Sequence, residues 1–310
     1  MLEPSENDIK KEKQSELDAI ANANAKCVAG YQIIRQHIFD NLEQAEIEAM
    51  NKYITVEYGK IYGELKQLII DGLNEAKIKN VEVVEKLLDL NLRKPKLYKT
   101  LPKTPAFKYT NAVFTKKSVS VRSKKAADAI TKIISDGRAN GTALVDIQKK
   151  VDIVMGFRDK RGVITKKAKA LIESGKFTHR NGSIYETYRI VNTELARMNA
   201  IAKYEQLKDL NKEFNNCRLK LKAILDRLPN GKWRTRPQSR AMNGFISDSK
   251  GRFIYPDNKY YHLGSAPARW SINDRETSYF VFLNDNELKN EYETQSRQRL
   301  TSTAVYGAKN

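Results

Sequence analysis

Three histidines are the first residues to consider for chemistry, because imidazole can bind a metal or transfer a proton near neutral pH. His37, His179 and His262 are scattered, and none has a second histidine or a cysteine at metal-ligand spacing. His179 stands in a basic loop flanked by glycines and could act as a general base, although a solvated loop histidine is the simpler interpretation. The motifs G-x-x-x-x-G-K-[ST] and G-x-S-x-G are both absent. The sequence therefore predicts no metal, no cofactor and no enzymatic activity.

Glu194 is the carboxylate with the best-placed partners. It lies in a strongly helical stretch, and Arg197 follows it by three residues, so the two side chains share one helix face. We favour a structural ion pair that fixes this helix to the sheet. The alternative is a nuclease or a nucleotide-using transferase built around Glu194, His179 and a basic sheet.

Positive charge is the clearest functional signal in the sequence. The net charge is +19, and it is unevenly distributed. Residues 1–90 contain 17 Asp and Glu against 11 Lys and Arg, whereas the rest of the chain contains 20 against 45. Residues 91–127 contain eleven Lys and Arg and no carboxylate. A run of this length without compensating charge favours a polyanionic partner.

We therefore predict that this run binds double-stranded DNA through its phosphates, without reading the base sequence. The aromatic side chains between the lysines could stack on bases, but we favour a role in anchoring the segment to the rest of the protein. A host factor that binds RNA or DNA, such as a ribosome-associated protein, is an alternative with the same charge. The candidate DNA-binding residues are Arg93, Lys94, Lys96, Lys99, Lys103, Lys108, Lys116, Lys117, Arg122, Lys124 and Lys125.

The composition is that of a chain with enough apolar residues for a substantial core. Hydrophobic residues make up 40% of 310 residues, which allows one large domain or two ordinary ones. No apolar run approaches the roughly 18–20 residues of a membrane span, and the first residues lack the pattern of a signal peptide. Cys27 and Cys217 lack metal-like spacing and are expected to be reduced, partly buried thiols.

Apolar residues at helical spacing predict long amphipathic helices in the first ninety residues, which contain no proline after Pro4. These helices are expected to fold back on one another. In residues 93–123, three prolines interrupt a lysine-rich stretch. Because proline breaks helices and like charges repel, this stretch is predicted to be an extended arm.

The later elements are predicted from helical spacing and from short aromatic runs. Helices are expected at residues 126–134, 144–154, 166–173, 184–210 and 219–228, with Thr142 as the N-cap of the second. Short strands separated by turn residues are expected at 244–246, 252–255, 259–263 and 279–283, as in a β-meander. A polar helix is expected at 288–300.

These elements predict an α+β fold. It consists of a long N-terminal helical hairpin or bundle, a basic extended arm, and a helical domain closed by a small antiparallel β-meander. The expected regions are an acidic helical region for protein docking at 1–90, the arm at 91–125, the α+β domain at 126–283 and a polar tail at 284–310.

The order of several short motifs between residues 125 and 283 resembles the minor head protein domain named for the F protein of phage Mu. Residues 136–147 look like the turn and helix that open that domain, and residues 192–197 are similar to its Arg-Thr-Glu helix. The family's later Trp, Arg-Thr-Arg, Gly and Phe positions also have counterparts in this chain. The positions for which the resemblance implies structural roles are Thr193, Glu194, Arg197, Trp233, Arg236, Gly244, Phe253, Asn273 and Arg275.

The chain also departs from this family. Asn192 stands where the family has arginine, and Asp274 and Glu276 stand where it commonly has paired cysteines, so no metal or thiol role is carried over. The resemblance implies a phage minor capsid protein of head morphogenesis. Such a protein is present in few copies in the capsid interior near the portal vertex, after assembly in the host cytoplasm. The implied partners are the portal protein or the major capsid protein, together with packaged DNA.

Overall fold

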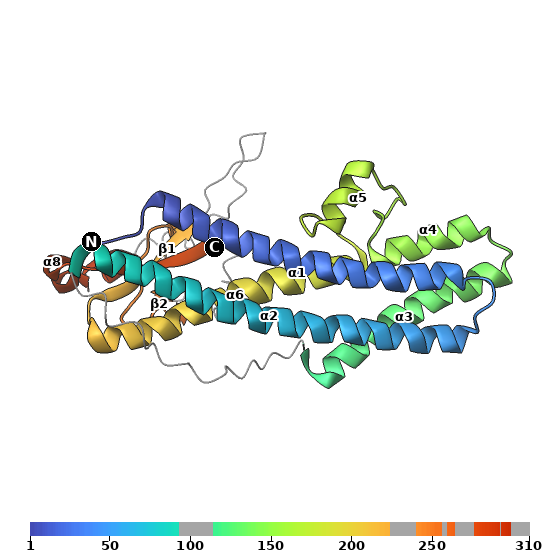
Figure 1. The fold of residues 1–310 in the computed structure, drawn as a ribbon, viewed down its shortest axis with the longest axis horizontal. Helices are drawn as coiled ribbons and strands as arrows, with labels where there is room; N and C mark the ends of the chain where they lie inside the picture. Colours follow the sequence, from blue (N-terminus) through green and yellow to red (C-terminus); the bar gives the residue numbers. More distant parts are fainter. Residues whose placement is uncertain (93–113, 224–239, 256–258, 264–275, 292, 299–310) are drawn as a thin grey trace, which may run out of the picture. The chain divides into compact units, whose positions relative to one another are not determined.

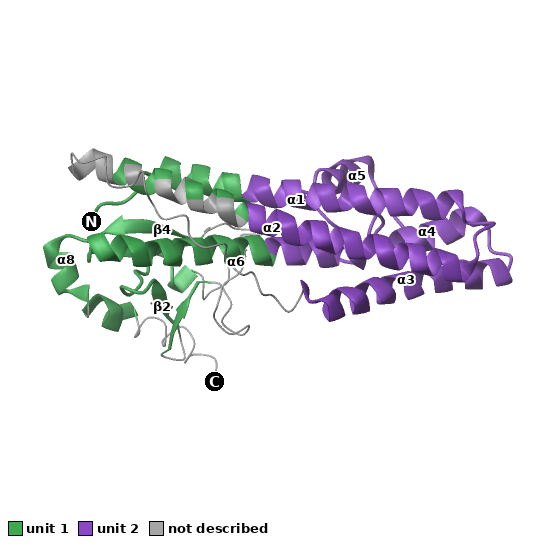
Figure 2. Cartoon of the chain, turned by 60° about the horizontal axis from the view of Figure 1, so that its bottom comes forward, with its two compact units in different colours: residues 1–16, 72–105, 193–310 green, residues 17–71, 106–192 purple. Residues whose placement is uncertain are grey.

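The computed structural model describes residues 1–92, 114–223, 240–255, 259–263, 276–291 and 293–298 (Figure 1). The chain divides into two compact units (Figure 2). Unit 1 comprises residues 1–16, 72–105 and 193–310, and unit 2 comprises residues 17–71 and 106–192. The units are therefore built from interleaved segments, whereas the sequence suggested consecutive regions.

Unit 2 contains a helical hairpin formed by parts of α1 (Glu6–Asp40) and α2 (Ile47–Leu92). The ring of Tyr31 lies 5.0 Å from that of Tyr58, and the ring of His37 lies 3.8 Å from that of Tyr53. The later residue of α1, His37, thus contacts the earlier residue of α2, Tyr53, so the two helices are antiparallel. This confirms the long N-terminal helices that the apolar spacing predicted.

The rest of unit 2 is built from α3 (Lys116–Ala139), α4 (Leu144–Met155), α5 (Lys166–Glu173) and the start of α6 (Gly182–Glu213). The prediction of an extended arm is wrong for residues 116–125, because α3 already begins at Lys116. Thr115 caps this helix by accepting a hydrogen bond from the Ser118 amide, and lysine is a good helix former. Thr142 is not the N-cap of α4, since Ala143 occupies that position without a side-chain bond.

Arg138, near the end of α3, holds the turn between α1 and α2. Its Nε donates to the Leu42 carbonyl at 2.7 Å and its Nη1 to the Ala45 carbonyl at 2.8 Å, while Nη2 also donates to Leu42. Carbonyls at the end of a helix lack intrahelical partners, so one guanidinium satisfies several of them. At Gly137, a Cβ would lie 2.6 Å from Ile147 Cδ1, so the glycine allows α3 and α4 to pack closely.

The sheet of unit 1 pairs β1 (Cys217–Ala223) with β4 (Glu276–Phe282) in antiparallel register. Isolated bridges extend it on both edges, from Phe282 to Leu2 and from Lys220 to Ile246. The helix predicted at 219–228 is wrong for residues 219–223, and residues 224–228 lie outside the described residues. In β1 the apolar side chains alternate with basic ones, and this spacing of two suits a strand with one face in the core.

A hairpin of β2 (Arg252–Ile254) and β3 (Tyr260–His262) accompanies this sheet. Since β4 pairs with β1 and not with β3, the described strands form two antiparallel pairs in place of a meander. Phe253 and Phe280 are almost fully buried in a core shared by the strands and α6. The short α8 (Asp285–Lys289) and a helical stretch at 293–298 follow. The α+β class is confirmed.

A buried lysine ties three elements of unit 1 together. Lys203 on α6 is only 2% exposed. Its ammonium group donates to the Thr277 hydroxyl at 3.2 Å and to the Ser278 carbonyl, and it forms an ion pair with Glu12 of α1. A buried ammonium needs such partners because its charge is costly to remove from water.

Both cysteines are free and buried, Cys27 in unit 2 and Cys217 in unit 1. Burial raises the pKa of each thiol to about 12. The prediction of free thiols is confirmed, although the side chains are fully and not partly buried. Among the described helices, none combines the length and the apolar character that crossing a bilayer requires.

Candidate nucleic-acid interface

Five of the eleven predicted DNA-binding residues lie on the first half of α3 in unit 2. The other six lie outside the described residues. The five on the helix are Lys116, Lys117, Arg122, Lys124 and Lys125, and the six outside are Arg93, Lys94, Lys96, Lys99, Lys103 and Lys108.

The amphipathic pattern of α3 determines which of these side chains face solvent. Its apolar face is fully buried and consists of Ala127, Ile130 and Ile134. Lys117 and Lys124 are exposed and stand seven residues apart, so they lie two turns apart on one face. Packing of the apolar face therefore holds these lysines outward on a rigid helix.

Charge on this part of α3 is uncompensated. Its first turn contains no acidic residue, so lysines stand beside the positive end of the helix dipole, where cations are unfavourable. Within the described residues, Lys116, Lys117, Lys124 and Lys125 form no ion pair. The first carboxylate of the helix, Asp128, accepts a hydrogen bond from Asn51 at 2.9 Å. An external anion would relieve both the lysine repulsion and the clash with the dipole.

Arg122 differs from the four lysines because it is half-buried. Burial and the nearby Glu186 raise the pKa of Tyr62 to about 12, while the Arg122 charge and its hydrogen bond to Tyr62 oppose that rise. Arg122 therefore serves the packing of α3 against α2, and the exposed lysines are the better candidates for an anion. We call Lys116, Lys117, Lys124 and Lys125 the α3 lysine surface.

A second basic group follows in the same unit. Residues 114–192 contain eighteen Lys and Arg against seven Asp and Glu. Part of this charge is on α5, where Lys166, Lys167 and Lys169 are exposed. Both views place α5 along α1 and the first turns of α3 on the side of α2 (Figures 1 and 2). The two basic groups thus form separate surfaces.

The residues that resemble the phage family occupy mostly structural positions where they are described. Glu194 is 5% exposed, and its Oε2 lies 3.8 Å from Arg197 Nη1, as in the ion pair that the sequence suggested. Thr193 is exposed on the same helix, Gly244 has φ of 86°, and Phe253 is buried in the core of unit 1. The remaining four lie outside the described residues, namely Trp233, Arg236, Asn273 and Arg275.

The histidines are not brought together. His179 belongs to unit 2, half-buried with its ring 5.5 Å from that of Phe177, whereas Glu194 belongs to unit 1. The ring of His262 stacks at 4.0 Å on Tyr204, and burial lowers its pKa. In the part of the chain that the structure describes, no group of three or more His, Cys, Asp or Glu could hold a metal ion.

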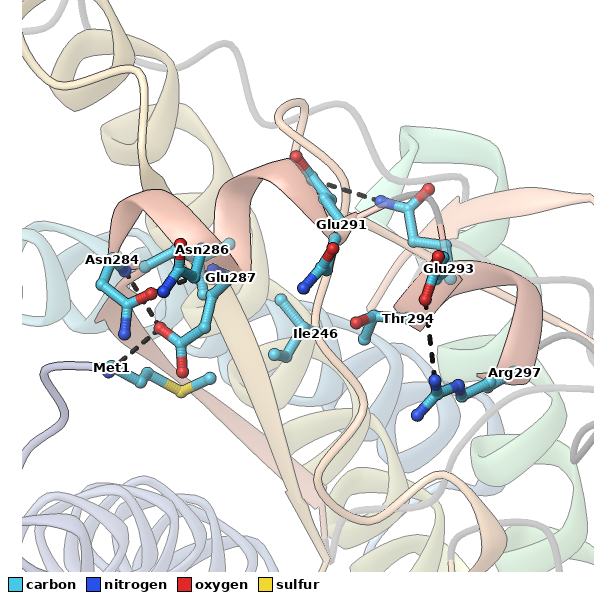
Figure 3. A pocket seen from close by; sticks show the side chains of 12 residues that line it. Met1, Ile246, Asn284, Asn286, Glu287, Glu291, Glu293, Thr294 and Arg297 are labelled. Atoms are coloured by element: carbon cyan, nitrogen blue, oxygen red, sulfur yellow. Dashed lines mark hydrogen bonds and ion pairs between the residues drawn. The ribbon is translucent and has the colours of Figure 1, made fainter.

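A cavity in unit 1 has several carboxylates in its lining. It has a volume of about 460 Å³ and lies beside α8 (Figure 3). Its carboxylates are engaged: Glu287 accepts a hydrogen bond from the Asn284 amide at 2.9 Å, and Glu291 accepts from Nε and Nη2 of Arg218, both at 2.7 Å. Glu293 lies 3.6 Å from Arg297. Among the side chains that line it are three glutamates and a single arginine, Arg297, which lies against Glu293, so the cavity is no candidate for the nucleic-acid interface.

One cluster was missed by the sequence analysis. Asp152 of α4 is 3% exposed and binds two arginines, Arg35 and Arg158. Arg35 stands 117 residues away from Asp152 in the sequence, and no local pattern connects such distant residues. The one signal in the sequence is that Asp152 falls on the apolar face of α4, where a buried carboxylate would need a cationic partner.

Comparison with known proteins identified no relative: no family model, no curated protein and no solved structure matches this chain.

Proposed function

We propose that the protein binds double-stranded DNA independently of its sequence, with the α3 lysine surface as a principal contact. The observation that carries this proposal is the set of four exposed lysines on one rigid helix, which lack ion-pair partners among the described residues. Lysine binds phosphate as a point charge, and a contact to phosphate reads no base, so such a contact is indifferent to sequence.

The dimensions of α3 suit a polyanion better than a single small anion. Residues 116–125 span about 14 Å at about 1.5 Å per residue. A DNA duplex carries one charge per roughly 1.7 Å of its axis, so about eight phosphates lie within that length. Several lysines can therefore meet phosphates at once, and each contact releases condensed counterions.

We further propose that this binding takes place in a phage head, where the protein is a minor capsid component between the portal or capsid shell and packaged DNA. The support is the motif order between residues 125 and 283 that resembles the minor head family, together with the acidic balance of residues 1–90, which suits docking on a protein. Finding the protein in purified virions by mass spectrometry, encoded beside a portal gene, would support this role. Recovery with ribosomal RNA and not with virions would favour the host-factor alternative.

Fluorescence anisotropy with two short duplexes of unrelated sequence tests the DNA proposal. The wild-type protein should bind both equally, with an affinity that falls steeply between about 50 and 200 mM salt. Replacing Lys116, Lys117, Lys124 and Lys125 by glutamine should reduce the slope of log K against log[salt] by up to about 3.6, which corresponds to four phosphate contacts. Glutamine is also a good helix former, so α3 should persist in the variant.

A matched control removes the same charge elsewhere. Lys10, Lys11, Lys26 and Lys52 are exposed lysines on α1 and α2, and their replacement by glutamine also removes four charges. This control should retain most of the wild-type slope. Equal losses in the two quadruple variants would mean that net charge alone drives binding, and the assignment to α3 would be wrong.

The enzymatic alternative has its own test. A nuclease built around Glu194 should nick plasmid DNA in the presence of a divalent metal, and Glu194→Gln should abolish the nicking. Our proposal predicts that the plasmid stays intact with both proteins.

A further inference from the structure

The feature that carries a further inference is the pair of arginines that share Asp152 in unit 2. Arg35 of α1 places its Nη2 3.1 Å from Asp152 Oδ2, and its Nε bonds the other carboxylate oxygen at 2.5 Å. Arg158, in the loop after α4, donates its Nε to Oδ2 at 3.1 Å. A single carboxylate thus orients two guanidinium groups and neutralises only one of them.

Each guanidinium has one nitrogen whose N–H donors are available to a ligand. Arg158 also donates Nη1 to the Gly162 carbonyl at 3.0 Å. Within the described part of the chain, Arg158 Nη2 and Arg35 Nη1 have no hydrogen-bond acceptor. The Arg35 guanidinium is held in place by the aromatic rings of Phe39 and Phe157, at 4.4 and 5.4 Å from their centres. The two groups are therefore preorganised, with donors left for a ligand.

Both arginines line a cavity of about 350 Å³ between α1, α4 and α5. Lys169 of α5 lines it as well, 65% exposed and 3.8 Å from Glu173. Gly175, just after α5, has φ of 69°, and a Cβ there would collide with the Ala21 carbonyl. The glycine therefore lets the end of α5 lie against α1.

The side chains that line the cavity have a net charge of +1. The three cations Arg35, Arg158 and Lys169 face the two carboxylates Asp152 and Glu173. Because the cations come from three different elements, they can surround an oxyanion from several directions. Arginine forks match phosphate geometry, and the surplus positive charge favours an anionic ligand.

We propose that this cavity, the Arg35–Arg158 pocket, binds a single phosphate group. The phosphate is either free in solution or at the end of a nucleic acid strand, and the chemistry recognised is the same. The inference does not rest on DNA binding by the α3 lysine surface, since the two sites share no residue. The quadruple α3 variant should therefore bind phosphate as the wild-type protein does.

Isothermal titration calorimetry of the full chain at low ionic strength tests this proposal. The ligands are inorganic phosphate, a short 5′-phosphorylated oligonucleotide and the same oligonucleotide without its phosphate. Saturable binding of inorganic phosphate would support the pocket with free phosphate as its ligand. Tighter binding of the 5′-phosphorylated oligonucleotide than of the unphosphorylated strand would support the pocket with a strand end as its ligand. Absence of saturable heat with inorganic phosphate, together with equal binding of the two oligonucleotides, would overturn the proposal.

Variants then assign the binding to the pocket. Lys169→Gln should weaken phosphate binding by about tenfold, the scale of one lost charge-assisted contact. Lys167→Gln removes the same charge from an exposed position of α5 outside the cavity lining and should have little effect. Arg158→Gln should weaken binding further, and circular dichroism must show that it is folded. Equal effects of the two lysine variants would refute the assignment even if Arg158→Gln failed to fold.

Discussion

Because Arg138 bonds the turn between α1 and α2, we expect its replacement to lower the free energy of unfolding. Its three shortest hydrogen bonds reach the carbonyls of Leu42 and Ala45. A net hydrogen bond to a charged group contributes about 1.5–3 kcal/mol, but bonds from one guanidinium are not additive and a partly exposed carbonyl can bind water instead. We therefore expect Arg138→Gln to lower the free energy of unfolding by about 2–4 kcal/mol.

Arg138→Lys should cost less, about 1–2 kcal/mol, because it keeps a cation near the negative end of the α1 dipole and can form one of the bonds. Urea denaturation followed by circular dichroism measures these values, and faster hydrogen exchange of the amides at residues 42–50 would localise the effect. The control is Lys132→Gln, an exposed residue of the same helix, with a change below about 0.5 kcal/mol. A loss from Arg138→Gln no larger than that of the control would refute the reasoning.

Three further predictions concern charge and titration. Replacing Lys116 and Lys117 by glutamate should raise the free energy of unfolding by about 0.3–1 kcal/mol per site while weakening DNA binding, and an unchanged affinity would remove these residues from the interface. Burial lowers the pKa of His262, so the unfolded chain binds its proton more readily; stability present above pH 6.5 is lost as the pH falls through the lowered pKa. The urea midpoint should then fall more on acidification in the wild type than in His262→Gln, and parallel falls would contradict this. Because burial raises the pKa of Cys27 and Cys217 to about 12, a thiol reagent should label them slowly in the native protein and fully in urea, whereas rapid native labelling would show that a thiol is accessible.

The fold could be predicted from the sequence wherever short-range signals determine it. The bounds of α5 match the prediction, because Thr165 caps its start and its apolar spacing stops at Glu173. The charge and the prolines upstream favour an extended segment up to the start of α3, whereas Thr115 and the continued apolar spacing favour the helix that the structure shows. A cap followed by good helix formers outweighs the mutual repulsion of a few exposed lysines.

The pairing of the strands in the sheet could not be predicted from short-range signals. The two-residue alternation of β1 was visible, but a helix was predicted there because leucines also suit the preceding helix. Its partner β4 begins more than fifty residues later, and nothing in either strand specifies that pairing before the chain has folded. Pairing depends on which faces the whole core must bury.

The two candidate sites also differ in whether the sequence alone could predict them. The α3 lysine surface could be predicted because residues 91–127 are continuous in the sequence and contain no acidic residue. The Arg35–Arg158 pocket depends on three separate elements meeting around one buried aspartate. Composition reveals a net charge, but only tertiary packing shows which charges neutralise one another.

The bridge between Leu2 and Phe282 has a consequence for synthesis of the chain. Two backbone hydrogen bonds, at 2.8 and 3.0 Å, attach the second residue to the end of β4. At about 5–20 residues per second, roughly 14–56 s separate the translation of these two residues. Unit 2 is fully translated once residue 192 has been made, whereas residues 1–16 must wait for a strand made far later. During that interval the apolar side chains at the start of α1, such as Ile9, lack their final partners on β4 and are open to chaperones or to other nascent chains.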